Sequence, residues 1–335
     1  MQKYRFLSLS TAYLLMTAGL TGCGPESQTI PDTPSSTPSR IEIEHESTVS
    51  AASVPAEESS VSSGTRDNTP VCLVPEAPGT VETRNDVAVI DTSHADCGYI
   101  MANYTGTVSK VKLRITSPDG TEYTYDLHGN GYETFPLSSG DGSYKIVIYE
   151  NISGTSYSTC LYTTISAVLA DEFSPFLYPN QYVNFNADSK TVKKGAELSQ
   201  GADNDLDVIT SVYDYIVSSI TYDYVKASDP PTGYTTNVDE ILESGTGICL
   251  DYAAVMAAML RSQQIPTRLE VGYAKDAYHA WISVYTKETG WLNGLIEFDG
   301  NTWTLVDPTF GANSSEKSLK KFIGDGSNYT LQKLY

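Results

Sequence analysis

The stretch GTGICLDYAAVMAAMLRS, residues 245–262, decides the fold of the C-terminal half of this chain. Gly245 and Gly247 end any preceding helix, and the run from Cys249 to about Ser262 has helical periodicity. The buried stripe of this helix consists of small and aliphatic side chains: Ala253, Met256, Ala257 and Leu260. The stretch therefore predicts a tight turn followed by a long core helix that opens on a cysteine.

Cys249 is placed where a thiol is reactive. Unpaired amides and the helix dipole at a helix start favour the thiolate. The same amides can hold the oxyanion of a tetrahedral intermediate. A buried structural cysteine explains Cys249 by itself equally well, because free cysteines are among the most buried residues.

His279 and Asp307 supply the other groups that thiol catalysis needs. His279 begins an alternating run that predicts a strand, and Asp307 ends a later strand just before Pro308. A carboxylate there can accept the second imidazole N–H of a histidine base. Each residue also has an ordinary reading, because lone histidines are mostly structural and Asp-Pro is common turn chemistry.

Residues 171–335 contain one cysteine and one histidine, Cys249 and His279. A zinc or iron site built from His and Cys is therefore not expected there. The segment has no Gly-x-Ser-x-Gly elbow and no phosphate-binding Gly-rich Lys motif. Of the kinds of catalytic site considered, only one based on a thiol remains. We expect no metal and no cofactor.

In the segments around Cys249, His279 and Asp307, the sequence resembles the bacterial branch of the transglutaminase-like superfamily. The resemblance extends over roughly residues 200–312. The resemblance implies an α+β, papain-related core with Cys249 as nucleophile, His279 as general base and then acid, and Asp307 as orienting carboxylate. Tyr222 is a candidate oxyanion donor, although a packed aromatic role is the alternative. The matching stretches are 220–223, 247–253, 260–261, 265–268, 272–273, 279–281 and 303–309.

Residues 71–170 carry short alternating runs, which predict a β-domain. Residues 111–115 and 123–127 alternate around the turn at 117–120, and residues 144–148 form a further strand. This pattern is typical of an immunoglobulin-like β-sandwich. Cys72, Cys97 and Cys160 allow at most one disulfide, and Cys97 with Cys160 is the pairing we consider.

The N-terminus predicts export and a lipid anchor. Residues 1–22 read as a lipoprotein signal peptide that ends at Cys23, the expected lipid-attachment residue. Residues 23–70 predict a disordered tether: from 24 to 70 there are no aromatic residues, and 23 of the 47 residues are Ser, Thr or Pro. The expected location is the outer face of the bacterial cell membrane.

The expected organisation is a multidomain chain: an all-β sandwich at 71–170, a connector at 171–199 and the catalytic domain at 200–335. The net charge of −20 argues against nucleic acid as a partner. We expect a cysteine peptidase or acyltransferase acting on amide bonds of proteins or peptides, including cell-wall or surface peptides. Hydrolysis is favoured over cross-linking because the setting is aqueous. The alternative is a non-catalytic surface-binding or adhesion protein that uses the same core as a scaffold.

Overall fold

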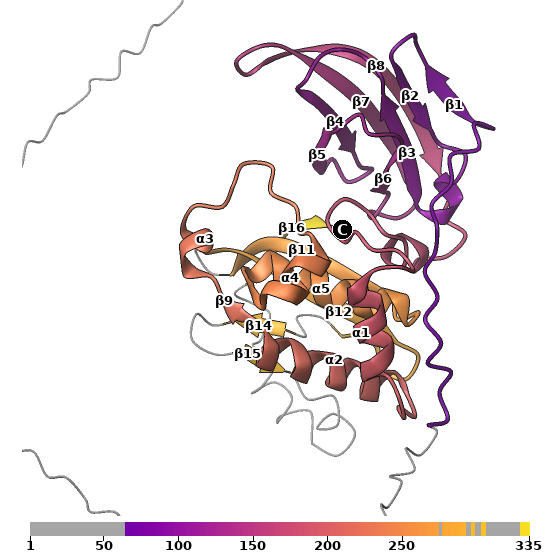
Figure 1. Cartoon of the computed structure of the whole chain (residues 1–335). Helices are drawn as coiled ribbons and strands as arrows, with labels where there is room; N and C mark the ends of the chain where they lie inside the picture. The colour runs from indigo at the N-terminus through magenta and orange to yellow at the C-terminus, as the bar shows by residue number, and fades with distance from the viewer. Residues whose placement is uncertain (1–63, 275–276, 293–295, 299–302, 306–328) are drawn as a thin grey trace, which may run out of the picture. The chain divides into compact units, whose positions relative to one another are not determined.

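The computed structural model describes residues 64–274, 277–292, 296–298, 303–305 and 329–335 (Figure 1). These residues belong to one compact unit, residues 59–335. Within these ranges, no helix is long and apolar enough to cross a membrane.

The N-terminal region is built from β-strands in two four-stranded sheets, with orders β1-β2-β3-β6 and β5-β4-β7-β8. The hairpin expected around residues 117–120 is confirmed: β4 and β5 pair antiparallel, with Val111 opposite Leu127. Gly120 donates its amide to the Ser117 carbonyl at 2.9 Å to close the turn. The strands are β1 (Glu82–Arg84), β2 (Ala88–Asp91), β3 (Tyr99–Tyr104), β4 (Val111–Thr116), β5 (Glu122–Leu127), β6 (Glu133–Pro136), β7 (Gly142–Ser153) and β8 (Ser156–Ala167).

The expected disulfide between Cys97 and Cys160 is wrong, because both cysteines are free. Cys72 is free as well. Cys97 ends the short 3-10 helix η1 (Ala95–Cys97), beside Asp96 and Tyr178. Cys160 lies in β8, where the Asn85 side chain contacts its sulfur. The two cysteines therefore have separate surroundings.

In the part of the chain that the structure describes, a run of helices begins the second, α+β region. Apolar residues spaced for one helix face over 206–220 predict a helix there, which is α2 (Asp205–Ser219), and the expected core helix is α5 (Cys249–Ser262). Asn237 followed three residues later by Glu240 is a sequence pattern that predicts a helix start, and Asn237 caps α4 (Val238–Ser244) by accepting from the Glu240 amide. Gly245 ends α4 with a φ of 60°, which only glycine adopts easily.

The sequence predicts an irregular connector at 171–199, but this segment contains a helix, α1 (Lys190–Leu198). Gly195 weakens the helical signal of this segment, because glycine has low helix propensity. Asp239 compensates from outside the helix. Its carboxylate accepts from the amide and hydroxyl of Thr191, at 2.9 and 2.8 Å, at the helix start. A short helix, α3 (Tyr224–Ser228), also follows Tyr222.

A four-stranded antiparallel sheet of order β13-β12-β11-β16 packs against α5. The sequence pattern predicts strands near 267–274, 278–286 and 301–307: the first two are β11 and β12, and the described part of the third is β15. The strands of this region are β9 (Thr221–Tyr222), β10 (Thr246–Gly247), β11 (Thr267–Ala274), β12 (Ala277–Thr286), β13 (Gly290–Leu292), β14 (Ile296–Phe298), β15 (Trp303–Leu305) and β16 (Tyr329–Leu334).

Arg261 joins three segments of this region from the end of α5. Its side chain is fully buried and donates to the carbonyls of Thr267, Tyr178 and Tyr335. Because these carbonyls belong to β11, the connector and the residue after β16, one guanidinium holds the sheet edge to the helix.

The last residues of the expected tether, 64–70, are not separate from the core. Arg66 pairs with Asp205 at the start of α2, at 2.7 Å, and donates to the Gln263 carbonyl. Thr65 donates its amide to Asp203 at 2.9 Å. The remainder of the expected tether, the expected signal peptide and Cys23 lie outside the described residues.

Candidate active site

A two-residue pairing brings Tyr222 next to the start of α5. Strand β9 runs parallel to β10, with Tyr222 opposite Gly247, and the Asp223 amide donates to the Gly247 carbonyl at 2.9 Å. Gly247 is required by close packing, because a Cβ there would lie 2.7 Å from Cβ of Asp251. The Gly-Thr-Gly turn therefore delivers Cys249 beside a tyrosine that is 27 residues earlier in the sequence.

The Cys249 thiol lies at the first position of α5, partly buried. Burial raises its pKa above the ordinary thiol value. The amides of Ala280 and Leu250 and the Tyr222 hydroxyl act in the opposite direction, because they donate hydrogen bonds to the sulfur. The amides thus favour the thiolate as expected, but burial outweighs them, so the thiol needs a base.

The Tyr222 hydroxyl contacts both the thiol and the backbone amide of Cys249. Burial, followed by the neighbouring Cys249, raises the pKa of Tyr222 to about 12. The hydroxyl is therefore protonated at neutral pH and able to donate. The Cys249 amide donates to its oxygen, so the hydroxyl lies beside the start of α5.

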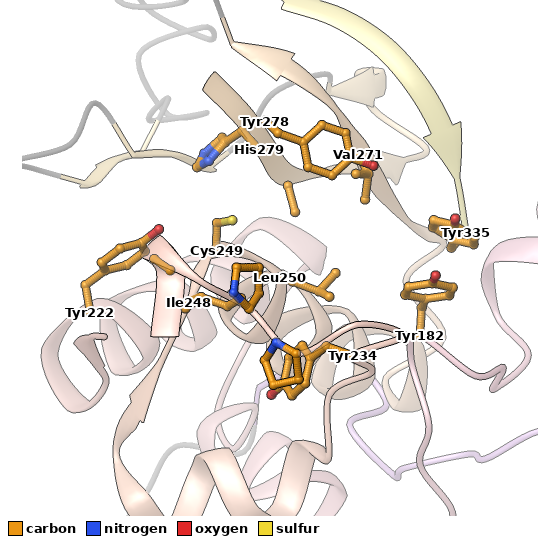
Figure 2. A pocket seen from close by; sticks show the side chains of 15 residues that line it. Tyr182, Tyr222, Tyr234, Ile248, Cys249, Leu250, Val271, Tyr278, His279 and Tyr335 are labelled. Carbon is orange, nitrogen blue, oxygen red and sulfur yellow. The ribbon is translucent and has the colours of Figure 1, made fainter. Parts of the chain in front are cut away.

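His279 lies in β12 and is 8% exposed. Its ring lies nearly parallel to that of Trp281, at 21° with centroids 6.5 Å apart, and the Trp281 indole donates to the buried carboxylate of Glu270. A base on a central strand, beside a hydrogen-bonded tryptophan, has a defined orientation. His279 and Cys249 line the same cavity, and Figure 2 shows both side chains, with Tyr222, converging at one end of it.

Asp307, the expected third member of the triad, lies outside the described residues. The nearby described strand β15 pairs with β14, which contacts β12, the strand of His279. The role of Asp307 therefore stays a prediction.

The cavity has a volume of about 280 Å³ and is lined largely by aromatic and apolar side chains. Four tyrosines in its lining were not singled out from the sequence: Tyr182, Tyr234, Tyr278 and Tyr335. They come from the connector, the loop before α4, strand β12 and the residue after β16. No sequence motif marks them, because only the folded chain brings these distant segments together.

Asp251 is a further residue without a role in the sequence-based interpretation, although it lies within the motif around Cys249. Its carboxylate is fully buried and accepts from the Ile248 amide at 2.9 Å. It also accepts from Lys226 at 2.8 Å, Tyr234 at 2.6 Å and Thr236 at 2.7 Å. One carboxylate thus ties the loop that carries Tyr234 to the first turn of α5.

The described residues that line the cavity include Cys249 and His279 but no Asp or Glu. Cys249 and His279 alone do not make a complete set of metal ligands. A candidate set lies elsewhere in the described residues, in the β-strand region. His94, Asp96 and Cys97 offer nitrogen, oxygen and sulfur atoms within 4.8 Å of one another around η1. Asp96 is exposed, and the cluster is not part of the cavity.

Residues 193–308 match the family model of the transglutaminase-like superfamily. Two curated proteins are similar over part of the chain. "Uncharacterized protein YebA" of Bacillus subtilis is 30% identical over 116 residues, 29% of this chain and 16% of that protein. "Protein-glutamine gamma-glutamyltransferase" of Pseudomonas aeruginosa is 30% identical over 118 residues, 30% of this chain and 16% of that protein. The chain thus spans about a sixth of the length of these relatives.

Solved structures are similar at low identity. A protein of Cytophaga hutchinsonii described as a candidate cysteine protease is 14% identical with a TM-score of 0.35, covering 76% of this chain and 74% of that one. Red sea bream transglutaminase is 13% identical with a TM-score of 0.26, covering 62% of this chain and 49% of that one. Residues 193–308, which include Cys249 and His279, match the transglutaminase-like superfamily model where the motifs around Cys249 predict it.

Proposed function

We propose that this protein is a cysteine-dependent acyl-transfer enzyme that acts on amide bonds of proteins or peptides through a thioester. The observation that carries the proposal is the shared cavity of Cys249, His279 and Tyr222. The superfamily core over residues 193–308 supports it.

In the first step His279 takes the proton of the Cys249 thiol as the sulfur attacks the amide carbonyl carbon. A general base is needed because burial raises the pKa of the thiol, so little thiolate is present at neutral pH. Asp307 would accept the other imidazole N–H and stabilise the imidazolium.

The tetrahedral intermediate carries its negative charge on the former carbonyl oxygen. The Cys249 amide and the Tyr222 hydroxyl are the donors that would hold this oxyanion. When the carbon–nitrogen bond breaks, His279 returns its proton to the amine, which leaves. The acyl group then remains on Cys249 as a thioester.

The acceptor decides the product. Water attacks the thioester to give a carboxylic acid and regenerate the thiol, which makes the enzyme a peptidase or amidase. A lysine amine instead gives a new amide and cross-links two chains. Hydrolysis is the favoured reaction, because water is abundant outside the cell.

The test is the trapping of the acyl-enzyme from a mixture of surface proteins and wall peptides. We expect a thioester adduct on Cys249 that water releases as acid and that added amine diverts to amide. Cys249→Ala should abolish both the adduct and labelling by iodoacetamide at this site. The opposite result is a reactive thiol that forms no adduct and turns over no peptide. That result would favour the alternative function, a non-catalytic binding or adhesion protein that uses this core as a scaffold.

The location is proposed from the N-terminal sequence. Export and acylation of Cys23 would hold the protein at the outer face of the membrane, with the acidic tether as spacer. Mass spectrometry of the N-terminal peptide should find the acyl chains on Cys23. A Cys23→Ser chain should leave the membrane fraction, and its retention there would contradict the anchor.

A further inference from the structure

We propose that the cavity beside Cys249 is a subsite for one large uncharged side chain, preferably aromatic, of a peptide bound next to its scissile amide. This subsite serves the reaction proposed above, and thus rests on the proposed function. It concerns which peptides are chosen, whereas Cys249 and His279 carry out the chemistry.

The lining offers no charged partner to an ionised side chain of a peptide, so such side chains are excluded from the cavity. Among the described residues that line the cavity there is no Asp, Glu, Lys or Arg. The buried Asp251 carboxylate lies behind Tyr234 and already accepts four hydrogen bonds. A charged side chain entering the cavity would therefore lose hydration without meeting a counterion, which is unfavourable.

The shape and surface of the cavity fit a single ring. Its volume of about 280 Å³ is just below the roughly 300–1,000 Å³ of pockets for small molecules, so it accommodates one large side chain. Leu250 and Val271 offer aliphatic contacts, and the rings of Tyr234 and Tyr278 offer the edges and faces that another ring packs against. Figure 2 shows these side chains between Cys249 at one end and Tyr182 and Tyr335 at the other.

The far wall is held in place before any ligand arrives. The rings of Tyr182 and Tyr335 stack with centroids 4.0 Å apart at 25°. Tyr335 and Leu269 exchange two backbone hydrogen bonds, at 2.8 and 2.9 Å, and Arg261 holds the Tyr335 carbonyl. A wall that is already ordered loses little entropy on binding, so it discriminates between side chains more sharply.

The binding test uses the full chain with Cys249→Ala, which removes the chemistry and leaves the cavity. Fluorescein-labelled capped hexapeptides that differ at one position, with Phe, Leu, Gln, Lys or Glu, are titrated by fluorescence anisotropy. We expect the Phe peptide to bind at least about 10-fold more tightly than the Lys and Glu peptides, with Leu and Gln between them. Equal affinities, a preference for Lys or Glu, or no binding of any peptide would overturn the subsite.

Two tyrosines of similar exposure give a matched pair of variants. Tyr278 is 63% exposed at the cavity and Tyr162 is 65% exposed on β8, outside it. We expect Tyr278→Ala to reduce the Phe-to-Lys affinity ratio several-fold and Tyr162→Ala to leave it unchanged. Leu250→Glu should reverse the ratio in favour of Lys, and an unchanged ratio in both cavity variants contradicts the proposal.

Alkylation of wild-type Cys249 by iodoacetamide tests the proposed function separately, because this reagent is too small to need the subsite. A reactive thiol with no peptide preference refutes the subsite alone. An unreactive thiol with the expected peptide preference refutes the enzyme and leaves a peptide-binding cavity.

Discussion

The ammonium nitrogen of Lys226 lies 2.8 Å from Oδ2 of Asp251, and that carboxylate is fully buried in the first turn of the helix that Cys249 opens. Burial lowers the pKa of Lys226, but its hydrogen bonds to Asp251 and Tyr234 outweigh burial and raise it. The negative charge of Asp251 in turn raises the pKa of the Cys249 thiol. This increase is small beside that from burial, and the positive charge of Lys226 next to the carboxylate acts against it.

Lys226→Met should lower the free energy of unfolding by about 2–3 kcal/mol, because it leaves a buried carboxylate without its cation. This figure is reduced from that of a fully buried pair, since the Lys226 side chain is 22% exposed. Urea unfolding measures the change. The control is Lys190→Met, which removes an ion pair to Glu243 whose side chains are 60% and 54% exposed. Equal effects of the two substitutions would contradict the special role of Lys226.

Tyr222→Phe should shift the pH dependence of Cys249 alkylation to higher pH. The thiolate reacts and its fraction increases with pH, so a raised thiol pKa moves the midpoint upward. Burial already places the pKa of Cys249 above the ordinary thiol value, and the Tyr222 hydroxyl partly offsets this effect. Loss of one hydrogen bond predicts a further upward shift of roughly 0.4–1 unit.

The same Tyr222→Phe variant should lower kcat about 100-fold if the hydroxyl also holds the oxyanion. Tyr215→Phe on α2, where Lys194 lies over the ring, is the control and should change neither quantity. If the pH midpoint of alkylation shifts but kcat does not fall, Tyr222 affects the ionisation of the thiol and does not hold the oxyanion.

His279→Ala should lower amide turnover by about 10²–10⁴-fold at neutral pH, the range for loss of a general base. Its alkylation rate by iodoacetamide should approach that of the wild type at pH values above the thiol pKa, where no base is required. Stopped assays of both reactions across pH separate these effects. Wild-type turnover in this variant would remove His279 from the mechanism.

Arg261→Lys should destabilise the fold by about 2–4 kcal/mol, because an ammonium cannot reach the three carbonyls that the planar guanidinium joins. Arg114→Lys is the control: its partner Glu122 is 3.2 Å away at the surface, and the cost should stay below about 0.5 kcal/mol. Thermal unfolding followed by circular dichroism compares the two. Similar melting temperatures would show that the Arg261 contacts do not hold the sheet edge.

Local patterns in the sequence determined the elements that begin and end with their own signals. The helix from Cys249 to Ser262, the cap at Asn237 and the hairpin around Gly120 lie where the sequence predicts them. Each depends on residues within a few positions of one another, so its physical cause is visible in the sequence.

Tertiary structure decided what depends on distant partners. Helix α1 obtains its N-terminal hydrogen bonds from Asp239, 48 residues after Thr191, and the cavity wall combines Tyr182 with Tyr335. The balance at Cys249 is of the same kind: the Leu250 amide of the helix favours the thiolate locally, the Ala280 amide does so from β12, and burial by the surrounding segments outweighs both. The sequence alone thus located the candidate nucleophile. Long-range packing decided its ionisation and its neighbours, because burial and side-chain contacts exist only once the chain has folded.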